Sequence, residues 1–246
     1  MNKIITTIAL LAFTSVSANA IDFERFSITG GLATNQSIWG ATAKQDDYNA
    51  AGTSIETTNK ESGVFTDGYA SQFIELGIGK YFSIGYEHTP DSVSTPENIN
   101  DGGANVIKAG AGGGAAGVLT SKVSVDFNDF NTTYAKLNLP FLGGAYIKAG
   151  TVSTDLDIKE TQLSGNTYNN VSIDGTSFGA GYAKQLGGSG FDLRFEGNYV
   201  ELDGVTVNNG VTKTAGTGIN NFKEIKASNL EGLTGKIALT YTFGRN

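Results

Sequence analysis

Several residue types are scarce or missing in this chain of 246 residues: cysteine is absent, proline occurs three times, and histidine and tryptophan occur once each. Without cysteine the fold cannot use disulfides as staples. Past the amino terminus, no segment approaches the roughly 18 consecutive apolar residues of a membrane-spanning helix, so a helical membrane protein is excluded. Basic residues are also outnumbered, 17 against 24 acidic ones, which argues against a nucleic-acid partner.

The amino terminus has the three-part pattern of a secretory signal peptide. Lys3 precedes an apolar run from Ile4 to Phe13, and small residues follow up to Ala20. This run is too short to cross the roughly 30 Å of hydrocarbon in a bilayer, so a membrane anchor is the weaker interpretation. We expect residues 1–20 to be a signal peptide cleaved after Ala20, and residues 21–246 to form one domain.

Apolar and polar residues alternate along eight segments of the mature chain. In FDLRFEGNYV, residues 191–200, apolar residues occupy most odd positions and charged or polar ones the even positions up to Asn198. Successive side chains of a strand point to opposite faces, so this pattern predicts a β-strand with one apolar and one charged face. Abundant glycine, 34 residues, suits an all-β chain with many turns. The predicted strands are 26–32, 74–78, 82–87, 133–139, 145–150, 176–185, 191–199 and 233–243. The glycines of segment 176–185 obscure which of its faces is apolar.

Short and long connections alternate strictly between these segments. The short ones are residues 79–81, 140–143 and 186–190, and the long polar ones are residues 34–69, 90–122, 155–174 and 203–226. A soluble sandwich has no reason to sort its loops in this way, whereas a transmembrane barrel has short turns on the periplasmic side and long loops outside. The sequence therefore predicts an all-β fold: an eight-stranded antiparallel up-and-down transmembrane β-barrel with four long outer loops and three short periplasmic turns.

Aromatic residues fall near both ends of the predicted strands, as expected for rings at the two membrane interfaces. Toward the outer ends lie Tyr86 and Tyr199, with Trp39 or Phe130 as further candidates. The residues near the periplasmic ends are Phe23, Phe26, Phe82, Phe141, Phe191, Tyr241 and Phe243.

The signal peptide, the eight amphipathic strands, the four long connections and the final strand LTGKIALTYTF together resemble the small outer-membrane β-barrels of Gram-negative bacteria, namely the OmpA transmembrane domain, OmpX and the opacity-type surface proteins. In that family the last strand usually ends the chain on an aromatic residue, whereas here Gly244-Arg245-Asn246 follow Phe243. The resemblance implies an outer-membrane location, a monomeric barrel in contact with lipid and lipopolysaccharide, outer loops at the cell surface, and no cofactor.

The charged faces of the predicted strands point into the barrel. An eight-stranded barrel is only wide enough for its own side chains, and charges buried there must pair. The predicted lumen residues are Glu75, Glu87, Lys136, Lys148, Asp192, Arg194, Glu196 and Lys236. Two interpretations remain open: a structural ion-pair network that fills the lumen, or the lining of a narrow conducting path.

Other chemistry is weakly indicated. His88 shares the lipid-facing side with Tyr86, and the His-x-Ser-Asn pattern of lipid A deacylases is replaced here by His88-Thr89-Pro90-Asp91. The glycine-rich stretch 109–117 lacks the Gly-Lys-Ser/Thr ending of a phosphate-binding loop. The acidic groups Asp46-Asp47, Asp126-Asn128-Asp129 and Asp155-Asp157 lack EF-hand spacing. We therefore predict no catalytic residue, no metal site and no cofactor.

Three functions are compatible with these features. The first is a non-enzymatic surface barrel that supports membrane integrity and whose exposed loops contact other cells, host surfaces, phage or small ligands. The second is transport, by a narrow pore or by a path for hydrophobic solutes as in the OmpW group. The third, more remote, is modification of lipid A.

Overall fold

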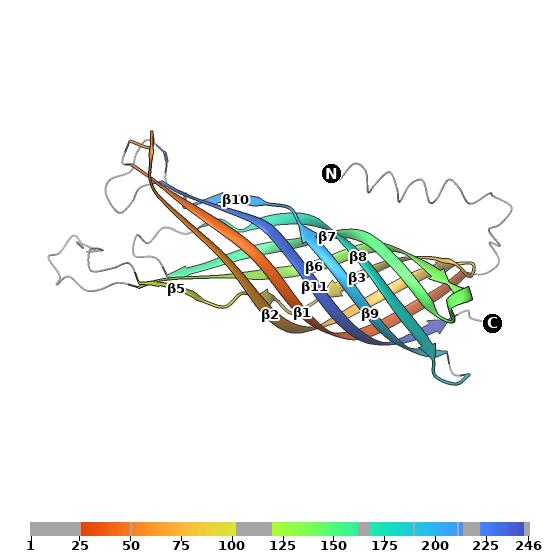
Figure 1. The fold of residues 1–246 in the computed structure, drawn as a ribbon. Helices are drawn as coiled ribbons and strands as arrows, with labels where there is room; N and C mark the ends of the chain where they lie inside the picture. Colours follow the sequence, from red (N-terminus) through yellow and green to blue (C-terminus); the bar gives the residue numbers. More distant parts are fainter. Residues whose placement is uncertain are drawn as a thin grey trace.

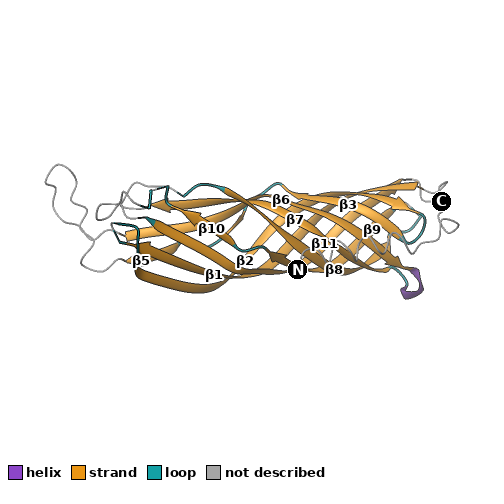
Figure 2. Ribbon diagram, turned by 90° about the horizontal axis from the view of Figure 1, so that it is seen from above, coloured by secondary structure: helices purple, strands orange, loops and turns teal. Residues whose placement is uncertain are grey.

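The computed structural model describes residues 26–49, 51–101, 120–161, 168–188, 190–210, 212–213 and 222–243. The predicted signal peptide, Phe23 and the glycine-rich stretch 109–117 lie outside these ranges. Figures 1 and 2 show an elongated barrel along which strands run almost from end to end.

Eight long strands form the wall of the barrel, and each pairs antiparallel with its neighbours in the ring. They are β1 (Phe26–Tyr48), β2 (Ile55–Ile78), β3 (Phe82–Thr89), β6 (Thr120–Leu139), β7 (Ala145–Thr161), β8 (Val171–Gln185), β9 (Phe191–Leu202) and β11 (Lys223–Phe243). Three short strands add to the sheet: β4 (Val93–Ser94) and β5 (Asn98–Asp101) pair with β6, and β10 (Val205–Asn208) pairs with β11.

Pairing between the first and last strands closes the ring. β1 pairs with β11 from Ile28, opposite Phe243, to Asp47, opposite Lys223. Closure satisfies the backbone N–H and C=O groups that an open sheet edge would expose, which is a requirement inside a lipid bilayer. The predicted eight-stranded up-and-down barrel is confirmed.

The three predicted short turns lie together at one end of the barrel, which we call the turn end. Residues 79–81 join β2 to β3, residues 140–144, which begin with the 3₁₀ turn Pro140–Leu142, join β6 to β7, and residues 186–190 join β8 to β9. Each contains a glycine with positive φ, namely Gly79 (63°), Gly143 (67°) and Gly187 (66°), a conformation that side chains disfavour. The purple segment in Figure 2, the 3₁₀ turn Pro140–Leu142, marks this end.

At the opposite end, the outer end, the strands are much longer than predicted. Most of the predicted loop 34–69 is strand, because β1 continues to Tyr48 and β2 begins at Ile55. β6, β7 and β11 likewise extend through residues that the sequence assigned to loops. The reason is visible in β2, where residues 55–64 are exposed on both faces and therefore carry no apolar alternation. In Figure 1 the end of the β1–β2 hairpin stands apart from the ends of β6 and β7.

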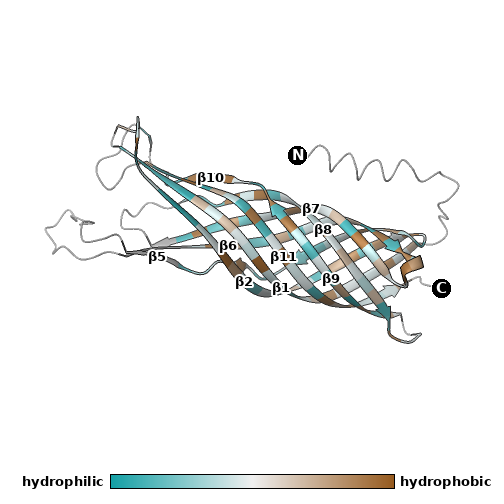
Figure 3. Cartoon of the chain, in the orientation of Figure 1, coloured by the Kyte–Doolittle hydropathy of each residue, from teal (hydrophilic) through white to brown (hydrophobic). Residues whose placement is uncertain are grey.

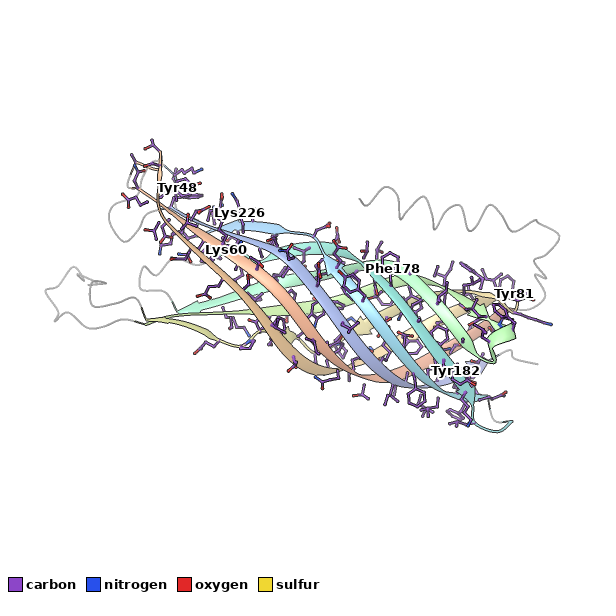
Figure 4. All side chains as sticks on the ribbon, in the orientation of Figure 1. Tyr48, Lys60, Tyr81, Phe178, Tyr182 and Lys226 are labelled. Atoms are coloured by element: carbon purple, nitrogen blue, oxygen red, sulfur yellow. The ribbon has the colours of Figure 1, made fainter. Side chains whose placement is uncertain are left out.

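Apolar side chains cover the outside of the barrel near the turn end. Leu32, Ile74 and Ile237 are 69%, 55% and 48% exposed, while their neighbours along each strand point inward. Figure 3 shows brown and teal positions mixed along these strands, and mainly teal positions at the outer end of β1 and β2. In Figure 4, Tyr81 and Tyr182 lie toward the turn end, whereas Tyr48, Lys60 and Lys226 lie near the outer end. Within the described ranges, no helix has the length and apolar character needed to cross a bilayer.

Strand β8 shows why its faces were hard to assign. Gly179 and Gly181 point into the barrel, and a Cβ on either would lie 2.2 Å from the Asn198 side chain or 2.4 Å from the Tyr146 ring. Its outward positions include Phe178 and Tyr182, which are 42% and 44% exposed. The glycines therefore lie on the inner face and make room there for large side chains of neighbouring strands.

Candidate functional site

The centre of the barrel contains a network of charged side chains, of which Glu75 on β2 is one focus. Arg194 on β9 donates from Nη1 to Oε1 at 2.8 Å and from Nη2 to Oε2 at 3.0 Å. The Tyr134 hydroxyl donates to Oε1 at 3.0 Å, and the Lys136 ammonium donates to Oε2. All four side chains are buried, so Glu75 is neutralised from both sides of the lumen.

Glu87 on β3 and Glu196 on β9 form the second focus, together with two lysines. Lys236 Nζ lies 2.6 Å from Glu87 Oε2 and 3.1 Å from Glu196 Oε1. Lys148 Nζ lies 2.5 Å from Glu196 Oε1 and 3.5 Å from Glu87 Oε2. Each lysine therefore bridges both carboxylates, and the four groups form one ionic cluster.

Neutral side chains donate further hydrogen bonds to the carboxylates of this second focus. The Ser71 hydroxyl donates to Glu87 Oε1 at 2.7 Å, and the Tyr146 hydroxyl donates to Glu196 Oε2 at 2.8 Å. The Asn198 amide donates to Glu196 Oε1 at 2.8 Å. Buried charges need such partners, because burial without them costs several kcal/mol per ion.

Aromatic rings connect the two foci. Lys148 Nζ lies 4.6 Å from the centroid of the Tyr134 ring, and Lys136 Nζ lies 5.3 Å from that of Tyr146, within the range of cation–π attraction. Side chains two residues apart in a strand lie on the same face, so Tyr134 shares a face with Lys136 and Tyr146 shares one with Lys148. Both rings could therefore have been included in the predicted set.

The structure brings seven of the eight predicted lumen residues into this network. Asp192, the eighth, is also buried, but it lies two residues closer to the turn end than Arg194, where the Thr240 hydroxyl is 3.4 Å from its backbone carbonyl. The network then holds three carboxylates and four basic groups. The residues are Glu75, Glu87, Glu196, Lys136, Lys148, Arg194 and Lys236.

A buried apolar cluster fills the barrel interior on the outer side of the charges. Trp39 on β1 is 3% exposed and stacks on Phe127 at a centroid distance of 6.1 Å, with Phe130 edge-on at 5.9 Å. Its Nε1 donates to the Ser37 hydroxyl at 2.9 Å. The buried members are Trp39, Phe65, Val93, Phe127, Phe130, Val152, Leu156, Ile173, Val200, Leu202 and Leu230.

This cluster corrects the prediction that Trp39 or Phe130 lies at the outer lipid interface, because both rings point inward and are buried. Tyr86 and Tyr199, in contrast, are on the outside and are 46% and 38% exposed. The cluster was not expected from the sequence, because the first predicted strand ends at residue 32. Continuing the two-residue period of β1 from Ser27 would have placed Trp39 on the inner face.

His88, considered above for catalysis, is held by an amide on the barrel wall. Its Nδ1 lies 2.8 Å from Asn131 Oδ1, which also accepts from the Tyr86 hydroxyl at 2.7 Å. Asn131 Nδ2 donates to the Asp129 carbonyl at 2.7 Å, which fixes the amide orientation. Because Oδ1 can only accept, Nδ1 of His88 is the protonated ring nitrogen.

The acidic groups that lack EF-hand spacing lie toward the outer end, on β1, β6 and β7. Asp46 and Asp126 each accept a hydrogen bond from a lysine there. Asp46 accepts from Lys44 Nζ at 2.7 Å and from Thr58 Oγ1 at 2.6 Å, and these hydrogen bonds lower its pKa. Asp126 accepts from Lys159. Burial alone would raise the pKa of Asp126, but hydrogen bonds from Lys159 and Ser94 outweigh it and hold the pKa below its ordinary value.

The wall and the interior together define the class of protein. A closed antiparallel barrel with an apolar exterior, a charged interior and short turns at one end is the architecture of bacterial outer-membrane proteins. The chain is therefore a transmembrane β-barrel of the bacterial outer membrane. Its interior is a packed core with a charged layer and an apolar layer.

Solved structures of outer-membrane barrels are similar to this chain at low sequence identity. OprG from Pseudomonas aeruginosa is 12% identical with a TM-score of 0.46, and the match covers 86% of this chain and 96% of OprG. AlkL is 12% identical with a TM-score of 0.45, over 88% of this chain and 90% of AlkL. Ail from Yersinia pestis is 8% identical with a TM-score of 0.34, over 86% and 99%. No protein-family model and no curated protein sequence matches the chain. Its assignment to the transmembrane barrels rests on its own strand pairing and exterior.

Proposed function

We propose that this protein is a non-enzymatic outer-membrane barrel that contacts an extracellular partner, such as a cell surface or a ligand, through its projecting strand ends. The observation that carries the proposal is the outer extension of the β1–β2 hairpin. Residues 55–64 of β2 are exposed on both faces, although they remain paired with β1. A bilayer-spanning strand needs only about 9–11 residues, so the 23 and 24 residues of β1 and β2 greatly exceed what crossing requires.

The composition of the extension supports a role in contact with polar partners. Basic side chains project from it and from the adjoining start of β11: Lys44, 41% exposed, pairs at 2.7 Å with the buried Asp46, and Lys226, 50% exposed, pairs at 2.8 Å with Glu224. β10 and the start of β11 widen the same sheet beside β1. An ordered sheet presents such groups in fixed positions, which lowers the entropy lost on binding compared with a flexible loop.

The filled interior supports the non-conducting alternative. The charged network pairs its carboxylates with basic groups across the lumen, and the apolar cluster around Trp39 covers the network on its outer side. Ions passing along the barrel would have to displace both layers. We therefore propose a structural role for the network, in which ion pairs hold opposite walls of the barrel together.

Two further proposals concern export and assembly. Residues 1–20 would direct export and be removed after Ala20. In the membrane the barrel would be a monomer surrounded by lipid and lipopolysaccharide, because closure of β1 on β11 leaves no strand edge there to pair with a second copy.

A hairpin truncation tests the surface role. Thr42 and Ser62 face each other across β1 and β2, so residues 43–61 can be replaced by Asn-Gly, which favours a two-residue hairpin turn. Bacteria displaying the truncated barrel should lose adhesion to cultured epithelial monolayers while the barrel still shows its gel-mobility shift on boiling. A full-length Lys60→Gln variant serves as a control for loss of a single charge. Unchanged adhesion of the truncated form would refute the role of this hairpin.

Transport and lipid modification are distinguished by separate measurements. In planar bilayers the refolded protein should give no stable unitary conductance, whereas reproducible single-channel steps would favour a narrow pore. The mass of lipid A should be the same in cells that express the wild type and in cells that express His88→Ala. A mass difference that depends on His88 would establish the enzymatic alternative instead.

A further inference from the structure

A groove with a volume of about 670 Å³ crosses the outside of the barrel wall, in the apolar part that faces lipid. It runs over β9, β11, β1, β2 and β3, five consecutive strands of the ring. Its lining residues include Gly30, Leu32, Ile74, Tyr86, Leu239 and Tyr241.

The strand register explains why a groove forms at this place. Five outward positions lie directly opposite one another across the five strands, in the order Phe191, Tyr241, Gly30, Ile74 and Tyr86. Gly30 interrupts this row, and a Cβ on Gly30 would meet no atom within 4 Å. The bare backbone of β1 therefore forms the floor of the groove, and the flanking side chains form its walls.

The next outward row, two residues closer to the outer end, changes from apolar to polar along its length. It contains Leu239, Leu32, Gln72 and His88, again directly opposite one another across β11, β1, β2 and β3. Gln72 and His88 also line the groove. Because Asn131 engages Nδ1 of His88, Nε2 is the ring nitrogen that can meet a ligand.

The two ends of the groove lie at different heights in the membrane. Phe191 is the first residue of β9, directly after a turn, whereas Tyr86 is followed by only three more residues of β3. The groove thus rises from an aromatic end near the periplasmic interface to a polar end, Gln72 and His88, nearer the outer interface. An amphiphile of the outer leaflet would enter it in that orientation.

We propose that this groove binds one acyl chain of an outer-leaflet lipid of the lipid A class, with the polar part of the lipid at Gln72 and His88. The proposal depends on the membrane location but not on a surface-binding role of the hairpin. Leu32, Ile74 and Leu239 are 69%, 55% and 49% exposed on the lipid-facing surface. In the membrane, the groove is therefore in contact with acyl chains. A chain that crosses the bare backbone of β1 at Gly30 contacts side chains on both sides, which a smooth barrel surface does not offer.

Native mass spectrometry of the refolded full-length chain with purified lipid A tests the proposal. The wild type should retain one lipid A after detergent washing, and Gly30→Phe, which fills the groove, should retain at least about tenfold less. Gly197→Phe is the matched control: Gly197 is also an outward glycine with no atom within 4 Å of its Cβ position, but it lies outside the groove lining. It should retain lipid A like the wild type. Gln72→Leu with His88→Leu should reduce retention of lipid A while leaving the gel shift intact.

A second measurement is photocrosslinking of lipid A to the wild-type barrel. Lipid A carrying a photoreactive acyl chain should crosslink to Leu32, Ile74 or Leu239, and not to Leu137 or Ile147, which are also exposed but lie on β6 and β7. The proposal would be overturned if the wild type retained no lipid A, or if both glycine variants lost lipid A equally. It would also be overturned by crosslinks spread over the whole wall, or by retention of phosphatidylglycerol equal to that of lipid A. Loss of lipid retention with adhesion preserved, or the reverse, separates this site from the proposed surface function.

Discussion

Arg194 and Glu75 form a two-point ion pair across the barrel lumen, with donor–acceptor distances of 2.8 and 3.0 Å, although 119 residues separate them in the chain. They lie on β9 and β2, which are not neighbours in the ring. The pair therefore connects walls that no backbone ladder joins directly. Glu75 also accepts from Lys136, so one carboxylate serves two basic groups.

Because Glu75 serves both Arg194 and Lys136, removing Glu75 should lower the free energy of unfolding more than removing Arg194. Glu75→Gln leaves Arg194 and Lys136 buried without their acid, and should lower the free energy of unfolding by about 3–5 kcal/mol. Arg194→Met leaves Glu75 paired with Lys136 and should cost less, about 1–2 kcal/mol. Urea unfolding of the refolded barrel in detergent measures both values.

The double variant Glu75→Gln with Arg194→Met supplies the control, because groups in one network do not act additively. It should cost less than the sum of the single variants. Equal losses in the two single variants, or strict additivity, would contradict a carboxylate shared between Arg194 and Lys136.

The position of Trp39 gives a spectroscopic prediction. It is the only tryptophan, and it is buried in the apolar cluster rather than placed in lipid. Its fluorescence should therefore not be quenched by brominated acyl chains in reconstituted vesicles. An Ile147→Trp substitution in a Trp39→Phe background places the indole on the lipid-facing side, where Ile147 is 48% exposed, and should be quenched strongly. Strong quenching of Trp39 itself would place it at the interface, as the sequence suggested.

The membrane-facing half of the fold was predictable because each strand there separates two different environments. Residues 191–199 place apolar side chains in lipid and charged ones in the lumen, so the two-residue period is visible in the sequence. The outer extension has no such contrast: residues 55–64 of β2 are exposed on both faces. Its strand pairing depends on the backbone ladder with β1, which leaves no mark on the pattern of hydrophobicity.

The sequence predicts which charged residues face the lumen, but not which of them contact one another. The alternation of side chains along each strand places Glu87 and Lys236 on inner faces, but it does not predict that these two residues contact each other. Their contact at 2.6 Å depends on the closure of the ring and on the relative stagger of β3 and β11, which are set by all eight strands together. The groove over Gly30 depends on register in the same way, since its five-strand row is not apparent from any one segment.

Gly85 provides a test of packing between the charged layer and the wall. A Cβ on this inward glycine would lie 2.3 Å from the ring of Tyr134, whose hydroxyl donates to Glu75. Gly85→Ala should displace that ring and lower the free energy of unfolding by about 1–3 kcal/mol. Gly197→Ala, where nothing lies within 4 Å, should change it by no more than about 0.5 kcal/mol. In a Tyr134→Ala background the cost of Gly85→Ala should largely disappear; persistence of the full cost would show that the ring is not the obstacle.

The Asp126–Lys159 pair, which joins β6 to β7 toward the outer end, predicts a pH response at acid pH. Hydrogen bonds from Lys159 and Ser94 hold the pKa of Asp126 below its ordinary value despite burial, so the ionised form is favoured in the folded state. A depressed pKa contributes stability that is complete above the ordinary value of about 3.9 and is lost as the pH falls through the lower, folded-state pKa. Hydrogen exchange of the Phe127 amide, where β6 pairs with β4, should therefore be unaffected between neutral pH and about pH 5 and become a few-fold faster, after correction for the intrinsic rate, only at lower pH. The effect is small because the Lys159 side chain is 58% exposed. In Asp126→Asn the protection should already be reduced at neutral pH and should not change on acidification. An identical acid response in that variant would assign the titration to another group.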